Sequence, residues 1–155
     1  MSNVRPLMHI CSVPLHDLDA LLALYAHLNP ADAPLPERAA VEGVWQELLA
    51  SPRYQCFGVY LENTLVSTCT LSVVPNLTRA CRPYGLVENV VTHPDYRNKG
   101  HGRAVLAHAL SFAWSQGCYK IMLLTGSKRE AVYRFYEAAG FDRNEKQAFV
   151  ARPAA

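Results

Sequence analysis

The chain has 155 residues, of which 50% are hydrophobic and 18% are charged, and its formal net charge at neutral pH is +2. This length predicts a single domain over residues 1–155, and the composition is typical of a globular protein with its own core. The small net charge argues against a nucleic-acid-binding protein, and no apolar stretch is long enough to span a bilayer.

The cysteines and the N-terminus indicate where the protein works. The five cysteines are scattered, odd in number and contain no Cys-x-x-Cys pair, which favours a reducing compartment and no zinc or other metal site. The N-terminus lacks a long apolar core behind a basic start, so no signal peptide is expected. We therefore expect a cytoplasmic protein that does not bind membranes.

The first half of the chain predicts two helices and a β-hairpin. Residues 7–13 favour a strand, and Asp17 is expected to cap a helix that runs to residue 28. Three prolines make 29–36 a loop, and a second helix is predicted over 37–50. A hairpin over 54–61 and 64–74 should turn at Glu62-Asn63. The expected inward-facing residues are Leu18, Leu21, Leu22 and Tyr25 in the first helix and Val41, Val44, Trp45 and Leu48 in the second.

The second half predicts strands joined by helices. An irregular connection over 75–85 leads to a central strand over 86–92, and a helix is predicted over 100–117. The remaining expectations are a strand over 119–125, a helix over 128–139 and a final strand over 147–151. A hairpin early in the chain and helical connections later imply an α/β fold, a mixed sheet with helices packed on it.

A basic, glycine-rich loop stands between the predicted central strand and the next helix. Helix N-termini expose unpaired N–H groups, and glycine allows a phosphate to approach the backbone closely. Arg97, Lys99 and Arg103 add positive charge, so we expect a phosphorylated ligand. The Walker spacing is absent, and only two of the three Rossmann glycines are present.

The pattern Arg97-x-x-Gly100-x-Gly102 resembles the pyrophosphate loop of the GCN5-related N-acetyltransferases, the GNAT family. Downstream, Phe135-Tyr136-Glu137-x-x-Gly140-Phe141 is similar to the closing signature of the same family. Residues 117–121 are similar to the matching point of glucosamine-6-phosphate N-acetyltransferases. The resemblance extends from about Leu86 to Phe141; before it, only the order of elements fits.

The resemblance implies the GNAT fold, acetyl-CoA as cofactor with CoA as product, and direct attack by an amine in a ternary complex. It gives Glu88 the role of assisting deprotonation of the amine, directly or through water, and Tyr136 the role of protonating the leaving thiolate. Each has a structural alternative: Glu88 as the anchor of a loop, and Tyr136 as a core aromatic residue.

Further contacts follow from the resemblance and from side-chain chemistry. The cofactor is expected to contact Val90, Val91, Thr92, Arg97, Asn98, Lys99, Gly100, His101, Gly102 and Arg103, with a backbone N–H near Val90 stabilising the oxyanion. Arg129 replaces the asparagine that the family often has, and a cation there could pair with cofactor phosphates. Asn89, Arg79 and Arg82 are candidate acceptor contacts, although the loop that holds Arg79 and Arg82 is equally compatible with a solvated surface loop.

The sequence therefore predicts an acetyl-CoA-dependent N-acetyltransferase. The expected acceptor is a primary amine on a small molecule, with an amino sugar as one candidate. Two alternatives stay open: a protein or peptide amine as acceptor, and a CoA-binding sensor without turnover. Small members of the family often dimerise, but no residue decides whether this chain is a homodimer.

Overall fold

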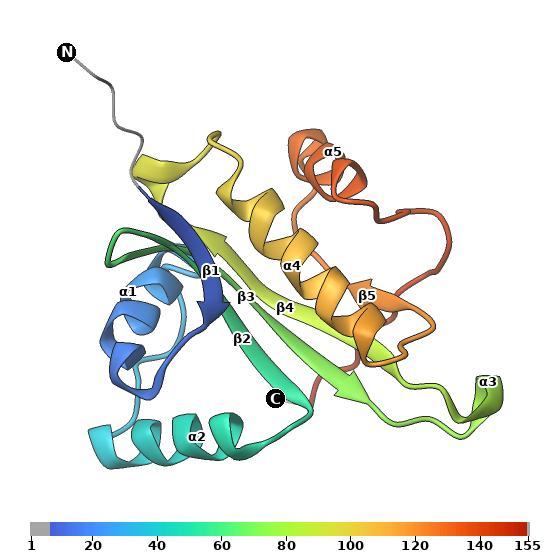
Figure 1. The fold of residues 1–155 in the computed structure, drawn as a ribbon, viewed down its shortest axis with the longest axis horizontal. Coiled ribbons are helices and arrows are strands. Elements are labelled where there is room, and N and C mark those ends of the chain that lie inside the picture. Colours follow the sequence, from blue (N-terminus) through green and yellow to red (C-terminus); the bar gives the residue numbers. More distant parts are fainter. Residues whose placement is uncertain (1–6, 155) are drawn as a thin grey trace.

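A five-stranded mixed sheet organises residues 7–154, the part of the chain that the computed structural model describes (Figure 1). Neighbouring strands are antiparallel from β1 to β4, and β4 and β5 are parallel. The predicted α/β fold with a mixed sheet is confirmed. The strands are β1 Met8–Ser12, β2 Tyr54–Leu61, β3 Thr64–Val74, β4 Tyr84–Thr92 and β5 Ile121–Leu123.

Helices cover both faces of this sheet. In Figure 1, α1 and α2 lie on one side of it, and α4 and α5 lie on the other. The helices are η1 Leu15–Asp17, α1 Leu18–Leu28, α2 Arg38–Ala50, α3 Thr78–Cys81, η2 Pro94–Tyr96, α4 His101–Ser115 and α5 Glu130–Ala138, where η marks a 3-10 helix.

Each face of the sheet carries its own hydrophobic cluster. Val105, Leu106 and Ala109 of α4 pack with Phe57 and Val59 of β2 on one face. Leu18, Leu21 and Leu24 of α1 and Trp45 of α2 pack with Cys56 and Tyr60 of β2 on the other. Because both faces are covered, consecutive residues of β2 and β3 are buried, over 56–60 and 65–71, rather than alternate ones.

The two N-terminal helices form where the sequence predicts them, but their details differ. Asp17 makes no cap hydrogen bond to α1; its carboxylate instead accepts a hydrogen bond of 2.7 Å from the Tyr60 hydroxyl. Leu24 is fully buried, whereas the predicted Leu22 and Tyr25 are only half-buried. The inward position predicted for Val44 is wrong, because its side chain is 57% exposed.

Among the strands, the predicted hairpin is confirmed with its bounds, and Glu62 takes the positive φ of 56° that its tight turn needs. The predicted strand over 147–151 is wrong, because this segment pairs with no strand within the described chain. The strand over 86–92 is not the central one: β3 occupies the middle, and β4 separates the antiparallel part of the sheet from its parallel edge.

Trp45 is the single buried residue of α2, at 3% exposure, so we expect it to carry most of that helix's attachment. Replacing Trp45 with alanine should lower the free energy of unfolding by about 3–5 kcal/mol, as for other buried large side chains. The adjacent Val44→Ala should change it by less than about 0.5 kcal/mol. Urea unfolding of both variants measures the difference, and equal losses would contradict this account of α2.

Candidate active site

A bulge interrupts β4 partway along the strand, where it pairs with β3. Glu88 pairs with Thr70 and Val91 pairs with Thr68, so Asn89 and Val90 together face only Cys69 of β3. Asn89 takes a φ of 51°, in the left-handed region that asparagine tolerates better than most residues. The Thr70 hydroxyl donates a hydrogen bond of 3.1 Å to the Glu88 carbonyl and so holds the strand beside the bulge.

Because of the bulge, side chains that would point to the same face of the sheet in a regular strand point to opposite faces before and after it. Val87 packs in the cluster under α4, whereas Val91 packs in the cluster under α1. In an uninterrupted strand, residues four apart lie on the same face. The inserted residue therefore lets β4 contribute to both cores, and it places Glu88 and Asn89 at the point of exchange.

From the bulge onward, β4 also has no paired strand on the side that faces β5. The pairing between β4 and β5 ends at Val87 and Leu123, although β4 continues to Thr92. We call residues 88–92 on this side the free edge of β4. The His93 N–H donates to Val66 of β3, so strand alternation directs the main-chain groups of Val90 away from β3 and toward the free edge.

A tight loop connects the free edge to α4. Asn98 and Gly100 have φ values of 59° and 86°, and Gly100 is the N-cap residue of α4. A Cβ on Gly100 would meet no atom within 4 Å, so the backbone is open to approach here. A Cβ on Gly102 would come within 3.1 Å of the Phe135 ring and 3.2 Å of the Thr92 hydroxyl, so this glycine allows α4 to pack closely against α5 and β4.

The basic side chains of the loop are held by main-chain carbonyls. The Arg97 guanidinium donates to the Thr92 carbonyl at 3.1 Å, and the Lys99 ammonium donates to the Asp95 carbonyl at 2.8 Å. Arg103 is exposed one turn into α4. Neither Arg97 nor Lys99 forms an ion pair with a carboxylate among the described residues, so their charge is available to an anion.

His101, the first residue of α4, is only 8% exposed. Its Nδ1 atom is buried and has no hydrogen-bond partner within residues 7–154. Burial and the neighbouring Lys99 lower the pKa of its imidazole, which is therefore neutral at physiological pH. The sequence places His101 in a polar loop, whereas the structure places it inside the domain, directly under the loop.

Tyr136 and Glu88 approach the same region from different elements. Tyr136 lies half-buried on α5 and packs against the rings of Phe135 and Phe141, with centroids 5.0 Å and 6.3 Å away. Burial is the main cause that raises the pKa of its phenol, followed by the charges of Cys69 and Glu88. Tyr136 is thus a proton donor at neutral pH, and Glu88 is close enough to affect its ionisation.

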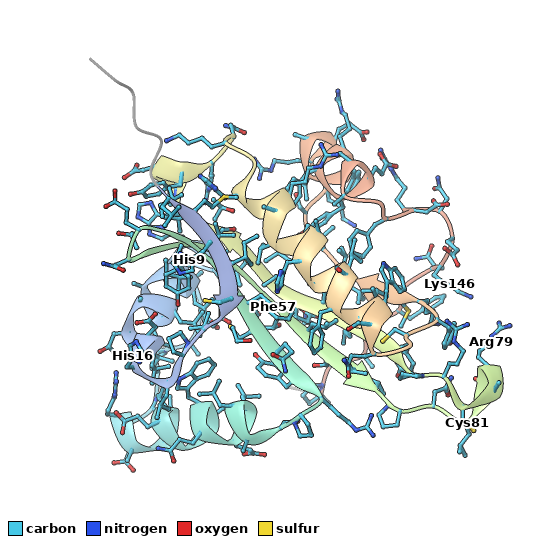
Figure 2. The ribbon with its side chains drawn as sticks, viewed as in Figure 1. His9, His16, Phe57, Arg79, Cys81 and Lys146 are labelled. Carbon is cyan, nitrogen blue, oxygen red and sulfur yellow. The ribbon has the colours of Figure 1, made fainter. Side chains whose placement is uncertain are left out.

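The structure does not bring every candidate residue to this region. Arg82 donates to the carbonyls of Gly117 and Cys118, each at 3.3 Å, and Arg79 lies 5.8 Å from the centre of the Tyr119 ring. Both belong to the connection around α3, which projects from the far end of the sheet (Figure 2). Arg129 is exposed at the N-cap of α5.

Sequence reasoning missed two residues that shape the site. Thr70 fastens the strand at the bulge, and Tyr25 of α1 lies beside Asn89 and Cys56. The signal for Thr70 was present in the sequence, since Ser67, Thr68 and Thr70 are hydroxyl residues placed among the apolar residues of β3, and all three are buried. Buried hydroxyl groups need hydrogen-bond partners, and here those partners hold adjacent strands.

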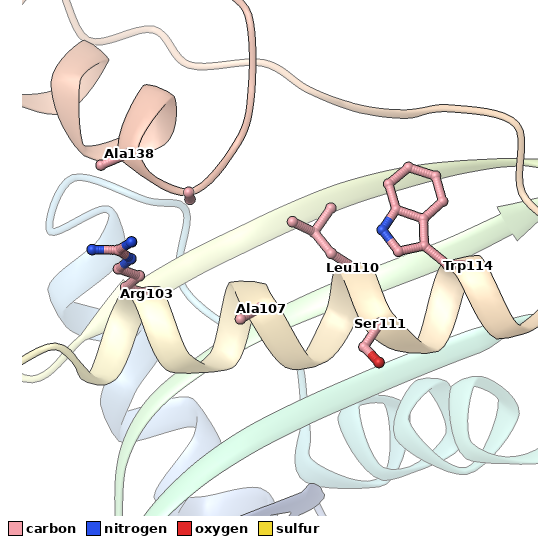
Figure 3. A pocket seen from close by; sticks show the side chains of 7 residues that line it. Arg103, Ala107, Leu110, Ser111, Trp114 and Ala138 are labelled. Atoms are coloured by element: carbon pink, nitrogen blue, oxygen red, sulfur yellow. The ribbon is translucent and has the colours of Figure 1, made fainter.

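A shallow groove of about 340 Å³ lies between α4 and α5, on the outer side of the loop (Figure 3). The helical spacing of Trp114 in the sequence favours a core position, but its side chain lines this groove and is 52% exposed, so that interpretation is wrong. Arg103 is the single charged side chain among the groove's lining residues, which are Arg103, Ala107, Leu110, Ser111, Trp114, Ala138 and Ala139.

None of the helices within residues 7–154 is long and apolar enough to cross a membrane. The same residues contain no group of three or more histidine, cysteine, aspartate or glutamate side chains arranged to hold a metal ion.

The chain matches the model of a known family over residues 18–141, the acetyltransferase (GNAT) family. The chain belongs to this family. The resemblance seen in the loop and in the Phe135–Phe141 motif is thereby confirmed, and the family consists of acetyl-transferring enzymes that use acetyl-CoA.

Individual relatives agree with this assignment. The chain is 36% identical over 83 residues to glucosamine 6-phosphate N-acetyltransferase of Trypanosoma brucei brucei, a match that covers 54% of each chain. It is 30% identical over 91 residues to glucosamine 6-phosphate N-acetyltransferase 1 of Dictyostelium discoideum, which covers 59% of this chain and 56% of that protein. The matches thus span only about half the length of these curated relatives.

Among solved structures, a protein from Agrobacterium tumefaciens str. C58 superposes with a TM-score of 0.88 at 43% identity, over 94% of this chain and 99% of the other.

Several tyrosine side chains are buried, and their burial makes the stability of the folded protein depend on pH. Burial raises the pKa of Tyr54 to about 12, and it also raises the pKa of Tyr25 and Tyr136. The folded state therefore holds these protons more tightly than the unfolded state. Their contribution to stability is complete below the ordinary phenol pKa near 10 and is lost as pH rises above it. Urea unfolding at about pH 8 and about pH 11 should show the loss, and Tyr54→Phe should reduce it; an equal loss in both proteins would exclude Tyr54 as a cause.

Proposed function

We propose that this protein transfers an acetyl group from acetyl-CoA to a primary amine on a small molecule, with a phosphorylated amino sugar as the favoured acceptor class. The observation that carries the proposal is the free edge of β4, which connects a basic helix N-terminus at one end to Glu88 at the other, and the charge of Glu88 contributes to the raised pKa of Tyr136 on α5. The names of the two curated relatives support an amino-sugar phosphate as acceptor.

The residues present suit CoA chemically. The N-terminus of α4, with its unpaired N–H groups, the open side of Gly100 and the charges of Arg97 and Lys99, suits a pyrophosphate. The free edge of β4 offers the main-chain N–H and C=O groups of Val90 and the N–H of Thr92, which suit the amide groups of a pantetheine arm, whereas the Thr92 carbonyl already accepts from Arg97. Asn98, His101, Gly102 and Arg103 belong to the same loop and helix start, whereas Val91 faces the core and supports the edge by packing.

Acetyl-CoA would supply an electrophilic thioester carbon at the free edge. Glu88 would accept the proton that an ammonium acceptor must lose before its nitrogen can attack, directly or through a water molecule. The Val90 N–H would stabilise the negative charge that develops on the carbonyl oxygen. The Tyr136 hydroxyl would donate its proton to the departing sulfur, since its raised pKa keeps the proton available at neutral pH.

Asn89 is our proposed acceptor contact, because it stands beside Glu88 in the bulge and is exposed. Arg79 and Arg82 do not lie in this region of the same chain, so we assign them no contact with the acceptor there.

Release of free CoA thiol from acetyl-CoA, measured with a panel of amines, tests the proposal. Glucosamine 6-phosphate should give the highest kcat/KM, above glucosamine and above lysine-containing or N-terminal peptides. A higher value for peptides would favour protein amines as acceptors. Tight CoA binding without turnover on any amine would favour a sensor and would overturn the proposed activity.

The loop should select CoA over other nucleotides. Isothermal calorimetry should show acetyl-CoA binding more tightly than ATP or NAD, because the glycine spacing matches neither rival pattern. Arg97→Ala should weaken acetyl-CoA binding by roughly 10- to 100-fold, as expected for loss of a charge-assisted hydrogen bond to phosphate. The control Arg53→Ala, an exposed arginine outside the loop, should bind normally. Equal affinity of Arg97→Ala and wild type would place the phosphates elsewhere.

Removing the hydroxyl of Tyr136 should slow turnover without weakening cofactor binding. Tyr136→Phe keeps the packing with Phe135 and Phe141 but removes the proton donor, so kcat should fall by about 10²-fold or more. The matched control is Tyr133→Phe on the same helix, whose ring lies 4.9 Å from the Arg143 guanidinium. Steady-state kinetics combined with a CoA titration separates the two effects. Unchanged kcat in Tyr136→Phe would leave Tyr136 as a core aromatic residue.

A further inference from the structure

His101 is a buried titratable side chain to which the proposed mechanism gives no step. It follows Gly100 at the start of α4, and its Nδ1 atom is buried without a hydrogen-bond partner within residues 7–154. A neutral imidazole has a proton on one nitrogen only, so Nδ1 is an unmatched donor in one tautomer and an unmatched acceptor in the other. Buried polar atoms nearly always have partners, so an exception beside an anion site needs a reason.

The neighbours of His101 disfavour a positive charge on its ring. The Tyr96 ring of η2 lies edge-on to it, with centroids 6.5 Å apart, and the Lys99 ammonium lies 5.3 Å from the centre of the same Tyr96 ring. Burial first, and then the charge of Lys99, lower the pKa of the imidazole. The Asp95 carboxylate lies 3.9 Å from the ring of His93 instead, and it makes no ion pair with His101 within the described residues.

The other elements at the start of α4 bring no carboxylate to His101. The adjacent Gly102 packs against the Phe135 ring of α5 and the Thr92 hydroxyl of β4, neither of which ionises near neutral pH. Arg97 adds a cation held at the Thr92 carbonyl, and the helix itself has its positive end here. A protonated His101 would therefore be buried among positive charges, and an anion at the loop would remove that obstacle.

We propose that His101 takes up a proton from solvent when a phosphorylated ligand binds at the N-terminus of α4, so that the protein binds this ligand more tightly as pH falls. The inference rests on the proposed binding of CoA at the loop. The pyrophosphate would offset the charges of Lys99, Arg97 and the helix end, which oppose imidazolium in the free protein. Because Nδ1 has no partner, an imidazole that is neutral with its proton on Nε2 can accept a second proton there without breaking a hydrogen bond.

An NMR titration of the histidines in the full-length protein tests the proton uptake directly. The signal of His101 is assigned by its loss in His101→Leu. Saturating CoA should raise the pKa of His101 by roughly one unit, which corresponds to about tenfold tighter binding to the protonated protein. The internal control is His16, which precedes α1 and is 82% exposed, so its pKa should not change. Bound CoA with an unchanged pKa of His101 would overturn the inference and leave the proposed function standing.

Calorimetry of CoA binding at about pH 8 and about pH 6 gives the matching change in affinity. The ratio of wild-type affinity to that of His101→Leu should increase by roughly 3- to 10-fold as the pH falls. Taking the ratio removes the titration of the phosphate monoester of CoA, whose pKa is about 6. His16→Leu is the matched control and should follow wild type at both pH values. A ratio that stays constant, with a variant whose circular dichroism matches wild type, would overturn the inference.

Inorganic pyrophosphate as a second probe separates the inference from the proposed function. A raised pKa of His101 with pyrophosphate, in a protein that does not bind CoA, would support the proton uptake and contradict the proposed cofactor. If neither anion changes the pKa of His101, the inference is wrong whatever the activity of the protein.

Discussion

The interruption of β4 is the constraint on which the rest of the structure depends. A regular strand at this position would pair on both sides and would leave no main-chain group for a ligand. Here the bulge at Asn89 and Val90 and the early end of β5 remove regular pairing from one stretch of the strand. Main-chain groups at such an edge need hydrogen-bond partners, from water or from a ligand. In the function that we propose, the amide groups and the thioester of acetyl-CoA provide these partners.

The rest of the domain is arranged to keep this irregularity stable. The left-handed backbone of Asn89 disfavours the bulge by about 1 kcal/mol, and the hydrogen bond from Thr70 to the Glu88 carbonyl offsets a similar amount. Val87 and Val91 then anchor the strand on opposite faces of the sheet, one under α4 and the other under α1. The hydrophobic clusters under α4 and α1 therefore hold β4 in place before and after the bulge, so the irregular residues need little stabilisation of their own.

Local patterns account for the elements that the sequence predicts correctly. The hairpin over β2 and β3 follows from two apolar runs and a short polar turn, and the start of α4 follows from Gly100 and the apolar periodicity after it. The incorrect predictions concern contacts between distant segments. Nothing near Val44 or Trp114 says which side of their helices meets the sheet, and both side chains are exposed.

The same limit applies to the site and to the end of the chain. Asn89 is the one local sign of a bulge whose register is set by Thr68 and Thr70, about 20 positions away in the sequence. The segment 147–151 has the composition of a strand, but a strand forms only when another supplies its hydrogen bonds, and no strand of the described chain pairs with it. The Arg97–Gly102 loop and the Tyr136 motif were easier to recognise because each lies within one short stretch of sequence.

The charge arrangement supports an anion site independently of any family resemblance. Arg38 and Arg143 are paired with carboxylates, Arg38 with Asp19 and Glu42 and Arg143 with Glu130 and Glu137. Arg97 and Lys99 are held by carbonyl oxygens instead, which orient a cation without cancelling its charge. The positive end of α4 adds to the same field, and the lowered pKa of His101 keeps a further charge out of the buried space beneath the loop. A loop built in this way is positioned in advance for an anion, so binding a pyrophosphate requires little reorganisation of the protein.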